Sequence, residues 1–275
     1  MQAIFETDSD TSDFDSAGFD SSMGDNPTRW LRETTQLDIR STTVRIMAKR
    51  ITQLVSSERA KAVAIHDYVK SLPFACHGDY FNFRASDVIK WGEGDCYTKG
   101  VLFVALLRAV RIPARLRFAT LCTDFLRGVI DSTQVTITYA LGEVLLAGRW
   151  YQTDTYVIDA PLNREVREKL RAEQAQSGYG IHALADQDWN GHDNAHAHYT
   201  AHDARSQPLT DWGVAHDLVR FYDDPTRAML RPSFMVRLKW QLGVGAINRK
   251  IEKIRTQALD MVGSSVAKHK ASSSA

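Results

Sequence analysis

Residues 92–108 read GEGDCYTKGVLFVALLR, and this stretch decides the fold. Two glycines and an acid precede a segment that is apolar almost all round, which is typical of a buried central helix. The segment Arg111-Ile112-Pro113 ends this helix, because proline disfavours helical geometry in the residue before it. The sequence therefore predicts a buried helix with Cys96 in its first turn.

Upstream of this helix the chain is first helical and then aromatic. From Thr43 the apolar residues recur mostly at three- and four-residue steps, and Ser57 offers an N-cap before a second such stretch. We therefore expect two amphipathic helices. Residues 71–85 are aromatic and interrupted by proline and glycine, which indicates a loop packed by its own side chains. Ser86-Asp87 then caps a short helical turn that ends near Gly92.

The chain downstream has the pattern of antiparallel strands. Residues 114–121 alternate arginine with leucine and phenylalanine, which indicates a half-buried strand. Residues 133–146 are rich in β-branched residues, Ala147-Gly148 supplies a tight turn, and residues 149–155 form the partner strand. A helix followed by antiparallel strands predicts the α+β class.

The last part of the chain divides into loop and helix. A charged helix is predicted over residues 161–173, a loop rich in Gly, Asn, Asp and His over residues 178–206, and renewed packing over residues 218–222. A helical pattern begins at Pro232, and residues 236–275 hold eight Lys or Arg and two acids, 8 − 2 = +6. Such a helix can lie on an anionic surface or on an acidic segment of the same chain, or it can dock on its own domain with its basic side chains in water.

The composition limits the class of protein. The 275 residues carry 34 Lys or Arg against 33 Asp or Glu, a net charge of +1, which gives no global electrostatic reason to bind nucleic acid or a membrane surface. No run approaches the roughly 18 apolar residues of a spanning helix, so we expect no integral membrane segment. Cys76, Cys96 and Cys122 are an odd number without metal-like spacing, and no secretory pattern precedes them, so we expect free thiols in the cytoplasm.

The charge pattern also divides the chain. Residues 1–25 hold seven acids and no Lys or Arg, a composition that cannot offset its ordering entropy by burial. We expect a disordered acidic tail at residues 1–25, a folded domain at 26–225, and a basic C-terminal helix and tail at 226–275. Either terminal segment is a candidate for binding a partner.

A cysteine in the first turn of a helix is placed for chemistry. The helix dipole and the free backbone N–H groups stabilise a thiolate, so we expect the pKa of Cys96 to fall below its usual value of about 8.5. The same N–H groups can hold an oxyanion if Gly94 lets a substrate carbonyl approach closely. Asp95 works against both effects, because a neighbouring anion opposes thiolate formation. The alternative is that Cys96 only fills space in the core.

The motifs around Cys96 resemble one known family. They are the stretch from Ala85 to Lys99, the Leu106-Leu-Arg-Ala that follows, Arg111-Ile-Pro-Ala-Arg115, and a hairpin with Glu143-Val144 and Gly148-Arg-Trp150 to Asp154. In this order they are similar to the transglutaminase-like cysteine superfamily over residues 45–160. The resemblance implies a papain-like α+β core in which the cysteine helix packs on an antiparallel sheet.

The resemblance also implies a catalytic triad of Cys, His and Asp that transfers acyl groups at amides. Cys96 matches the nucleophile and Asp154 matches the acid, but the position of the histidine is Tyr139 in this chain. Tyrosine, with a pKa of about 10, is a poor general base but can donate a hydrogen bond. Tyr139 is therefore a candidate general acid or oxyanion donor whose hydroxyl donates to Asp154. The alternative is that Tyr139 simply packs in its strand.

Further residues are candidates for the same site. We expect Trp91, Gly94 and Tyr97 to line the acyl site, although a tryptophan beside glycines can also cover the core. Lys99 either lowers the pKa of the thiol or lies in solvent, and His77 is a candidate replacement base. The remaining candidates are the loop histidines His192, His196, His198 and His202. Their spacing could place an imidazole over the active site or bind a metal, although loop histidines are more often solvated.

We therefore expect covalent acyl transfer or amide hydrolysis through Cys96, on a peptide, a protein or a small-molecule acyl substrate. Thiol chemistry of this kind needs neither a metal nor an organic cofactor, and we expect none. The alternative is a catalytically inactive protein of transglutaminase fold that binds a partner in its cleft, because no histidine matches the triad position.

Overall fold

A four-stranded sheet forms the centre of the molecule. The structure is a computed structural model that describes residues 26–130 and 134–272, with side chains up to residue 256, so the expected tail at 1–25 lies outside the described residues. The strand order is β3-β2-β1-β6, and every pairing is antiparallel. The strands are β1 (Ala114–Cys122), β2 (Thr136–Leu146), β3 (Arg149–Thr153) and β6 (Thr210–Ala215). The predicted α+β class is confirmed.

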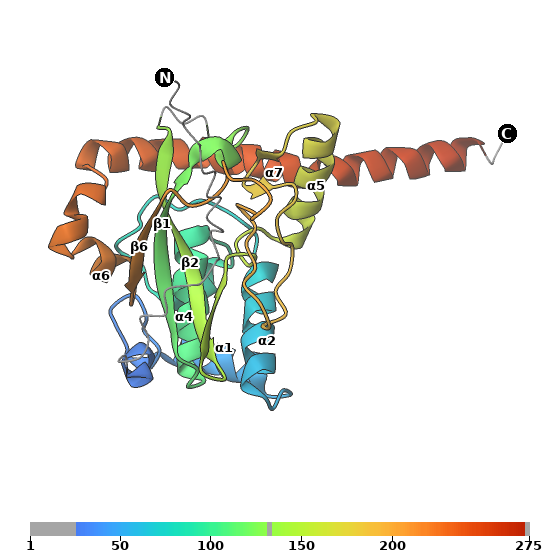
Figure 1. The fold of residues 1–275 in the computed structure, drawn as a ribbon. Helices are drawn as coiled ribbons and strands as arrows, with labels where there is room; N and C mark the ends of the chain where they lie inside the picture. Colours follow the sequence, from blue (N-terminus) through green and yellow to red (C-terminus); the bar gives the residue numbers. More distant parts are fainter. Residues whose placement is uncertain (1–25, 131–133, 273–275) are drawn as a thin grey trace, which may run out of the picture.

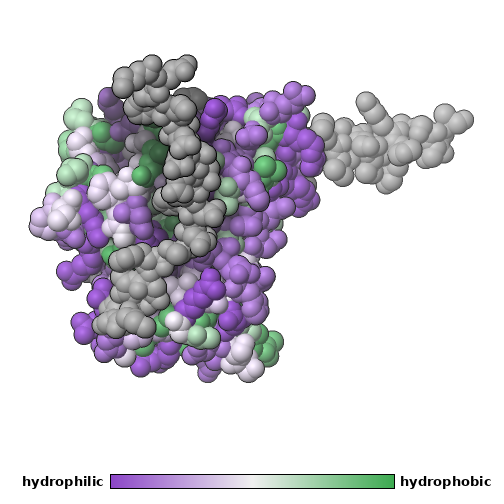
Figure 2. All heavy atoms as spheres, in the orientation of Figure 1, coloured by the Kyte–Doolittle hydropathy of each residue, from purple (hydrophilic) through white to green (hydrophobic). Residues whose placement is uncertain are grey.

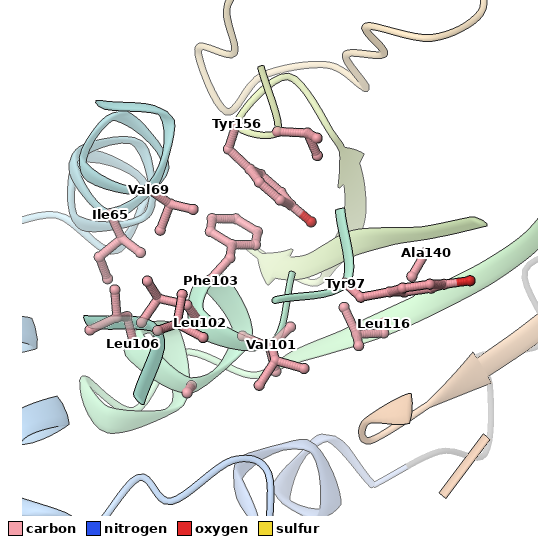
Figure 3. Packing of buried hydrophobic residues seen from close by; sticks show 14 of the residues in the cluster. Ile65, Val69, Tyr97, Val101, Leu102, Phe103, Leu106, Leu116, Ala140 and Tyr156 are labelled. Atoms are coloured by element: carbon pink, nitrogen blue, oxygen red, sulfur yellow. The ribbon is translucent and has the colours of Figure 1, made fainter. Parts of the chain in front are cut away.

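Helix α4 (Cys96–Ala109) packs between this sheet and three other helices. These helices are α1 (Thr42–Thr52), α2 (Glu58–Ser71) and α3 (Ala85–Trp91). Nearly every side chain of α4 is buried, as its apolar pattern predicts. Figure 3 shows Phe103 between the α2 residues Ile65 and Val69 and the ring of Tyr156, which stacks on Phe103 with centroids 4.7 Å apart. Burial on all sides fixes the position of Cys96 at the start of α4.

Local predictions differ from the structure at four places. The predicted loop over residues 178–206 begins with a small hairpin, in which Gly178 pairs with Ile181. The short helix α3 begins at Ala85 after an Arg84 cap, so Ser86 lies inside it and the expected cap is wrong by two residues. Strand β1 is buried on both faces and not half-buried, because Glu143 forms ion pairs with Arg115 and Arg117 and so allows both arginines to pack. Strand β6 was not expected, because its short segment lacks a clear alternation.

The remaining elements cover the ends of the sheet. They are η1 (Pro27–Leu31), η2 (Thr123–Leu126), α5 (Ala160–Ala172), β4 (Ser177–Gly178), β5 (Ile181–His182), α6 (Leu218–Tyr222), η3 (Pro225–Leu230) and α7 (Phe234–Ser272). Figure 1 shows α7 running across one end of the sheet and past α5. Ile251 and Ile254 anchor it in the core. None of the helices described here has the length and apolar character needed to cross a membrane.

Candidate active site

The helix that carries Cys96 begins with a side-chain cap. Asp95 Oδ1 accepts hydrogen bonds from the Tyr97 and Thr98 amides at 3.1 and 3.0 Å. In return the Asp95 amide donates to Thr98 Oγ1 at 2.8 Å, which completes a capping box. The carboxylate therefore occupies two N–H groups that were expected to be available to an oxyanion.

A second segment runs alongside the start of the helix. Phe74 and Gly94 form a parallel bridge, in which the Ala75 amide donates to Gly94 O at 3.0 Å. A Cβ atom added at Gly94 would lie 2.5 Å from Thr98 Oγ1. Glycine is therefore required here by the close approach of Thr98, and the expected role of Gly94 toward a substrate carbonyl stays a prediction.

The direction expected for the pKa of Cys96 is wrong. Cys96 is partly exposed, yet burial of its thiol raises the pKa well above the usual range, and Asp95 and Cys76 add to the rise. The Tyr97 amide acts in the opposite direction and does not outweigh them. The helix dipole cannot ionise the thiol alone, because the Asp95 carboxylate already occupies the same end of the helix. Cys96 therefore needs a base to act as a nucleophile at neutral pH.

Tyr139 lies in β2 and belongs to a small apolar cluster of side chains that packs against Cys96. It is 2% exposed. The other members of the cluster are Leu121, Phe125, Leu141 and Tyr199. The Tyr139 hydroxyl lies 3.0 Å from Nδ1 and 3.4 Å from Nε2 of His198, and burial raises the pKa of this hydroxyl well above its usual value. The hydroxyl therefore stays protonated and can donate to the imidazole.

His198 brings an imidazole to the acid of the site. Its Nδ1 atom lies 3.0 Å from Asp154 Oδ2, while Asp154 Oδ1 accepts a hydrogen bond from the Ala197 amide at 2.6 Å. Asp154 and His198 are 0% and 4% exposed. The expected hydrogen bond from the Tyr139 hydroxyl to Asp154 is wrong in the described structure, because both side chains contact His198 instead.

Asp154 is held in its ionised form. Burial acts to raise its pKa, but the charge and hydrogen bond of His198, together with the Ala197 amide, outweigh burial and lower the pKa. The ionised carboxylate can accept a hydrogen bond from the Nδ1–H of His198, which leaves Nε2 as the basic nitrogen. This is the arrangement in which a carboxylate orients a general-base histidine.

Backbone pairing fixes the irregular segment that carries His198. The Asp154 amide donates to Ala195 O at 3.2 Å, and the Ala195 amide donates to Gln152 O at 3.0 Å. Thr153 and Ala195 thereby form a parallel bridge at the end of β3. His198 follows this bridge by three residues, so the sheet that carries Asp154 also positions the imidazole.

The other candidate bases lie in different surroundings. His196 stacks on Tyr199, and His77 stacks on Trp91. His192 and His202 are exposed. Among residues 26–130 and 134–256, no three His, Cys, Asp or Glu side chains are grouped as metal ligands.

Lys99 is buried, and the expectation of a solvated lysine is wrong. Its Nζ atom donates to the carbonyl oxygens of Leu72, Tyr156 and Val157 at 2.5, 3.2 and 2.8 Å. Burial lowers the pKa of Lys99 to about 7. Its contacts join α4 to two neighbouring segments rather than to the thiol.

Two pockets adjoin the site. Tyr97 lines one of about 520 Å³, and its hydroxyl donates to Thr138 O at 2.5 Å beside Tyr139. Aromatic side chains form much of this wall: Tyr80, Phe81, Tyr97, Tyr222 and Trp240. The other pocket, of about 360 Å³, is lined by His198 among more polar residues. Trp91 lines neither, is 42% exposed and stacks on His77, so its expected place beside the acyl site is not supported.

Sequence comparison agrees with this architecture. Residues 45–155 match a family model described as the transglutaminase-like superfamily. The matched span includes Cys96, Tyr139 and Asp154, and His198 lies beyond it. No curated protein matches the chain.

Two solved structures are similar to part of the chain. One, from Cytophaga hutchinsonii, is described as a candidate cysteine protease; it has 21% identity and a TM-score of 0.40, and the match covers 50% of this chain and 43% of that one. The other, from Parabacteroides distasonis, is described as a candidate protease, with 15% identity, a TM-score of 0.31, and coverage of 46% and 24%. This chain thus spans less than half the length of either protein, and similarity at this level carries no argument about function.

Proposed function

We propose that this protein, whose residues 45–155 form a transglutaminase-like core, is a cysteine-dependent enzyme of acyl transfer or amide hydrolysis. Cys96 is the nucleophile, His198 the general base, and Asp154 the acid that orients the base. The Tyr139 hydroxyl contacts the imidazole and helps to hold it in place. The observation that carries the proposal is the 3.0 Å contact of His198 Nδ1 with Asp154 Oδ2, next to the cluster that packs against Cys96.

The proposed reaction follows from the protonation states of these groups. The S–H proton of Cys96 moves to His198 Nε2 while the sulfur bonds to the acyl carbon. The leaving amine takes this proton as the C–N bond breaks, and a thioester remains on Cys96. Water or a second amine then attacks the thioester after losing a proton to His198, and the imidazole returns a proton to the sulfur. Water as acceptor gives hydrolysis, and an amine gives transfer.

The aromatic pocket beside Tyr97 is the proposed site of the acyl donor. It adjoins Thr138, the neighbour of Tyr139 in β2, and Tyr80 and Trp240 form part of its wall. A concave wall of this kind favours a donor with an apolar or aromatic group.

A catalytically inactive binding domain is the second candidate. Two observations favour it: the pKa of the Cys96 thiol is raised, and no hydrogen bond joins Cys96 to His198 within the described residues. In this case the same pocket would bind a partner without turnover.

Acylation by p-nitrophenyl acetate distinguishes the two candidates. We expect the wild-type protein to form an acetyl thioester at Cys96, detected by mass spectrometry of the intact protein and its peptides, with one equivalent of p-nitrophenolate released. Cys96→Ala should form no such adduct. In His198→Ala the rate of Cys96 acylation should fall at least about 100-fold, because general-base catalysis contributes about 10² to 10⁴ in rate.

The other two cysteines are internal controls for this experiment. Cys76 is buried, and Cys122 is partly exposed and lines the same pocket as His198. Two outcomes would contradict the proposal of an enzyme and favour the binding domain. One is acylation of Cys122 at the same rate as Cys96, and the other is an unchanged rate of Cys96 acylation in folded His198→Ala protein.

A further inference from the structure

The beginning of α7 exposes a concentrated group of large apolar side chains. Twelve such side chains are exposed in the described part of the chain, and six of them lie between Met229 and Leu242. These six are Met229, Phe234, Met235, Val236, Leu238 and Leu242. Phe234 and Leu242 are 73% and 80% exposed. Removing such a side chain from water is favourable by about 1.5 to 3 kcal/mol. An exposed apolar group of this size marks an interaction surface.

The charges around this group have one sign. Residues 225–251 contain six Lys or Arg and no Asp or Glu. Arg227 and Arg231 form ion pairs with the preceding Asp224 and Asp223 at 3.8 and 3.5 Å. The other four, Arg237, Lys239, Arg249 and Lys250, follow along α7 with no acid between them.

The two sides of α7 have different roles. Trp240, Val244, Ile247 and Ile251 pack against the hydrophobic core. Phe234, Leu238 and Leu242 recur every four residues and lie on the opposite side, together with Met235, Lys239 and Arg249, all of them exposed. We call these six residues the outer face of α7. Figure 2 shows apolar atoms at the upper left of the molecule, where Figure 1 places the start of α7.

We propose that the outer face of α7 docks the protein on the surface of an anionic lipid bilayer. A helix that lies in the interface inserts Phe, Leu and Met side chains at the acyl boundary and keeps Lys and Arg at the head groups. Each basic residue near an anionic surface adds attraction, and the exposed Glu252 further along α7 forms an ion pair with Arg255. The inner face stays packed on the domain, so docking needs no unfolding.

The opposite side of α7 lies at the pocket beside Tyr97. Val236, Arg237 and Trp240, which are not part of the outer face, line that pocket. Docking through the outer face would therefore place α7 between the bilayer and the pocket. This inference does not depend on the chemistry at Cys96.

Two other occupants fit the outer face less well. The acidic segment 1–25 has complementary charge, but its large apolar residues are chiefly three widely spaced phenylalanines, at 5, 14 and 19. Three such residues do not match a row with one apolar side chain per helical turn. A second copy of this chain would bring its own Lys239 and Arg249 against the same basic residues, and like charges oppose that contact.

Vesicle sedimentation of the full-length protein tests the proposal. We expect at least tenfold stronger partition onto vesicles of phosphatidylcholine and phosphatidylglycerol than onto phosphatidylcholine alone, and weaker partition at high salt. Leu238→Gln with Leu242→Gln, and separately Lys239→Glu with Arg249→Glu, should each reduce partition at least tenfold. The matched control is Leu54→Gln with Leu184→Gln, two leucines that are 92% and 63% exposed elsewhere on the surface.

The outcomes separate the occupants. Circular dichroism melting establishes that each variant is folded, which is expected because the substituted side chains are exposed. Absence of partition, equal partition onto both vesicles, or equal loss in the control variant overturns the proposal. A dimer in analytical ultracentrifugation that Leu238→Gln with Leu242→Gln abolishes, with no vesicle binding, assigns the outer face to a second copy instead.

Discussion

Tyr139 and His198 are in contact beside Asp154, although they are 59 residues apart in the chain. His198 contacts both the Tyr139 hydroxyl and Asp154 through Nδ1, at 3.0 Å each. With Asp154 ionised, the Nδ1–H of His198 donates to the carboxylate and cannot accept from the Tyr139 hydroxyl, which lies 3.4 Å from Nε2. We infer that Tyr139 acts through His198 as a positioning residue rather than by direct contact with the thiol.

Lys99 gives a pH-dependent prediction at the scale of one residue. A free lysine has a pKa of about 10.4, and burial lowers that of Lys99 to about 7. Between these values the unfolded chain binds a proton that the folded chain does not, so stability rises with pH. We expect Lys99 to contribute a rise in the free energy of unfolding of up to about 1.4 kcal/mol per pH unit from neutral pH toward its unfolded pKa.

The measurement compares wild type with Lys99→Met by urea denaturation at a series of pH values above neutral. The substitution leaves the carbonyls of Leu72, Tyr156 and Val157 without this donor, so the variant should be the less stable protein at alkaline pH. The difference in unfolding free energy should grow as pH rises. A constant difference would mean that Lys99 does not titrate in this window.

The residues of the site differ in how far the sequence predicts them. Cys96 and Asp154 are marked by local motifs, because a helix start and a hairpin leave signals within a few residues. His198 is only one of four histidines in an irregular segment, and nothing in their spacing distinguishes it. Its position depends on the contact of Ala195 with β3, a non-local pairing that leaves no periodicity. The raised pKa of the thiol is equally non-local, because burial is its largest cause.

At the scale of elements, the start of α4 depends on a glycine that has no room for a side chain. Gly94→Ala should destabilise the protein by about 1 to 3 kcal/mol, because the new Cβ would lie 2.5 Å from Thr98 Oγ1 in the cap. Acylation at Cys96 should slow with it, since the cap holds the first turn of α4. Chemical denaturation and the acylation assay measure the two effects.

Gly243→Ala is the matched control for this substitution. Gly243 lies inside α7, and nothing is within 4 Å of a Cβ atom at this position. Alanine there should stabilise the protein by about 0.5 to 1 kcal/mol, because glycine is the weaker helix former. If the two substitutions change the free energy of unfolding equally, the lack of room for a side chain at Gly94 is not what the cap of α4 depends on.

The elements follow the sequence where their patterns are local. Ser57 caps α2 through its hydroxyl, as predicted, and the two-residue turn at Ala147-Gly148 joins β2 to β3 with both residues at positive φ. Strand β6 was missed because it is defined by pairing with β1 and has little pattern of its own. The burial of Arg115 was missed for a related reason, since its partner Glu143 lies on another strand.

At the scale of the whole molecule, α7 is linked to the helix start through the segment 73–77. Asn248 Oδ1 accepts a hydrogen bond from the Cys76 amide at 2.8 Å, and Asn248 Nδ2 donates to Cys76 O at 3.0 Å. The Trp240 indole donates to His77 O at 2.6 Å, and the His77 amide donates to Asp95 Oδ2 at 3.1 Å. A continuous chain of contacts therefore joins α7 to the cap of α4.

Asn248→Ala should loosen this link without removing the helix. Cys76 is 5% exposed, so its thiol reacts only when the segment opens locally. Loss of both Asn248 hydrogen bonds, worth about 1 kcal/mol each, should raise the rate of Cys76 modification about tenfold or more. The measurement is timed labelling with a disulfide reagent at mildly alkaline pH, followed by peptide mass spectrometry to separate Cys76 from Cys96 and Cys122.

Thr256→Ala is the control, because Thr256 Oγ1 donates only to carbonyls within α7. If Cys76 reacts at the same rate in both variants, α7 does not hold the segment, and the cap of α4 is stable without it.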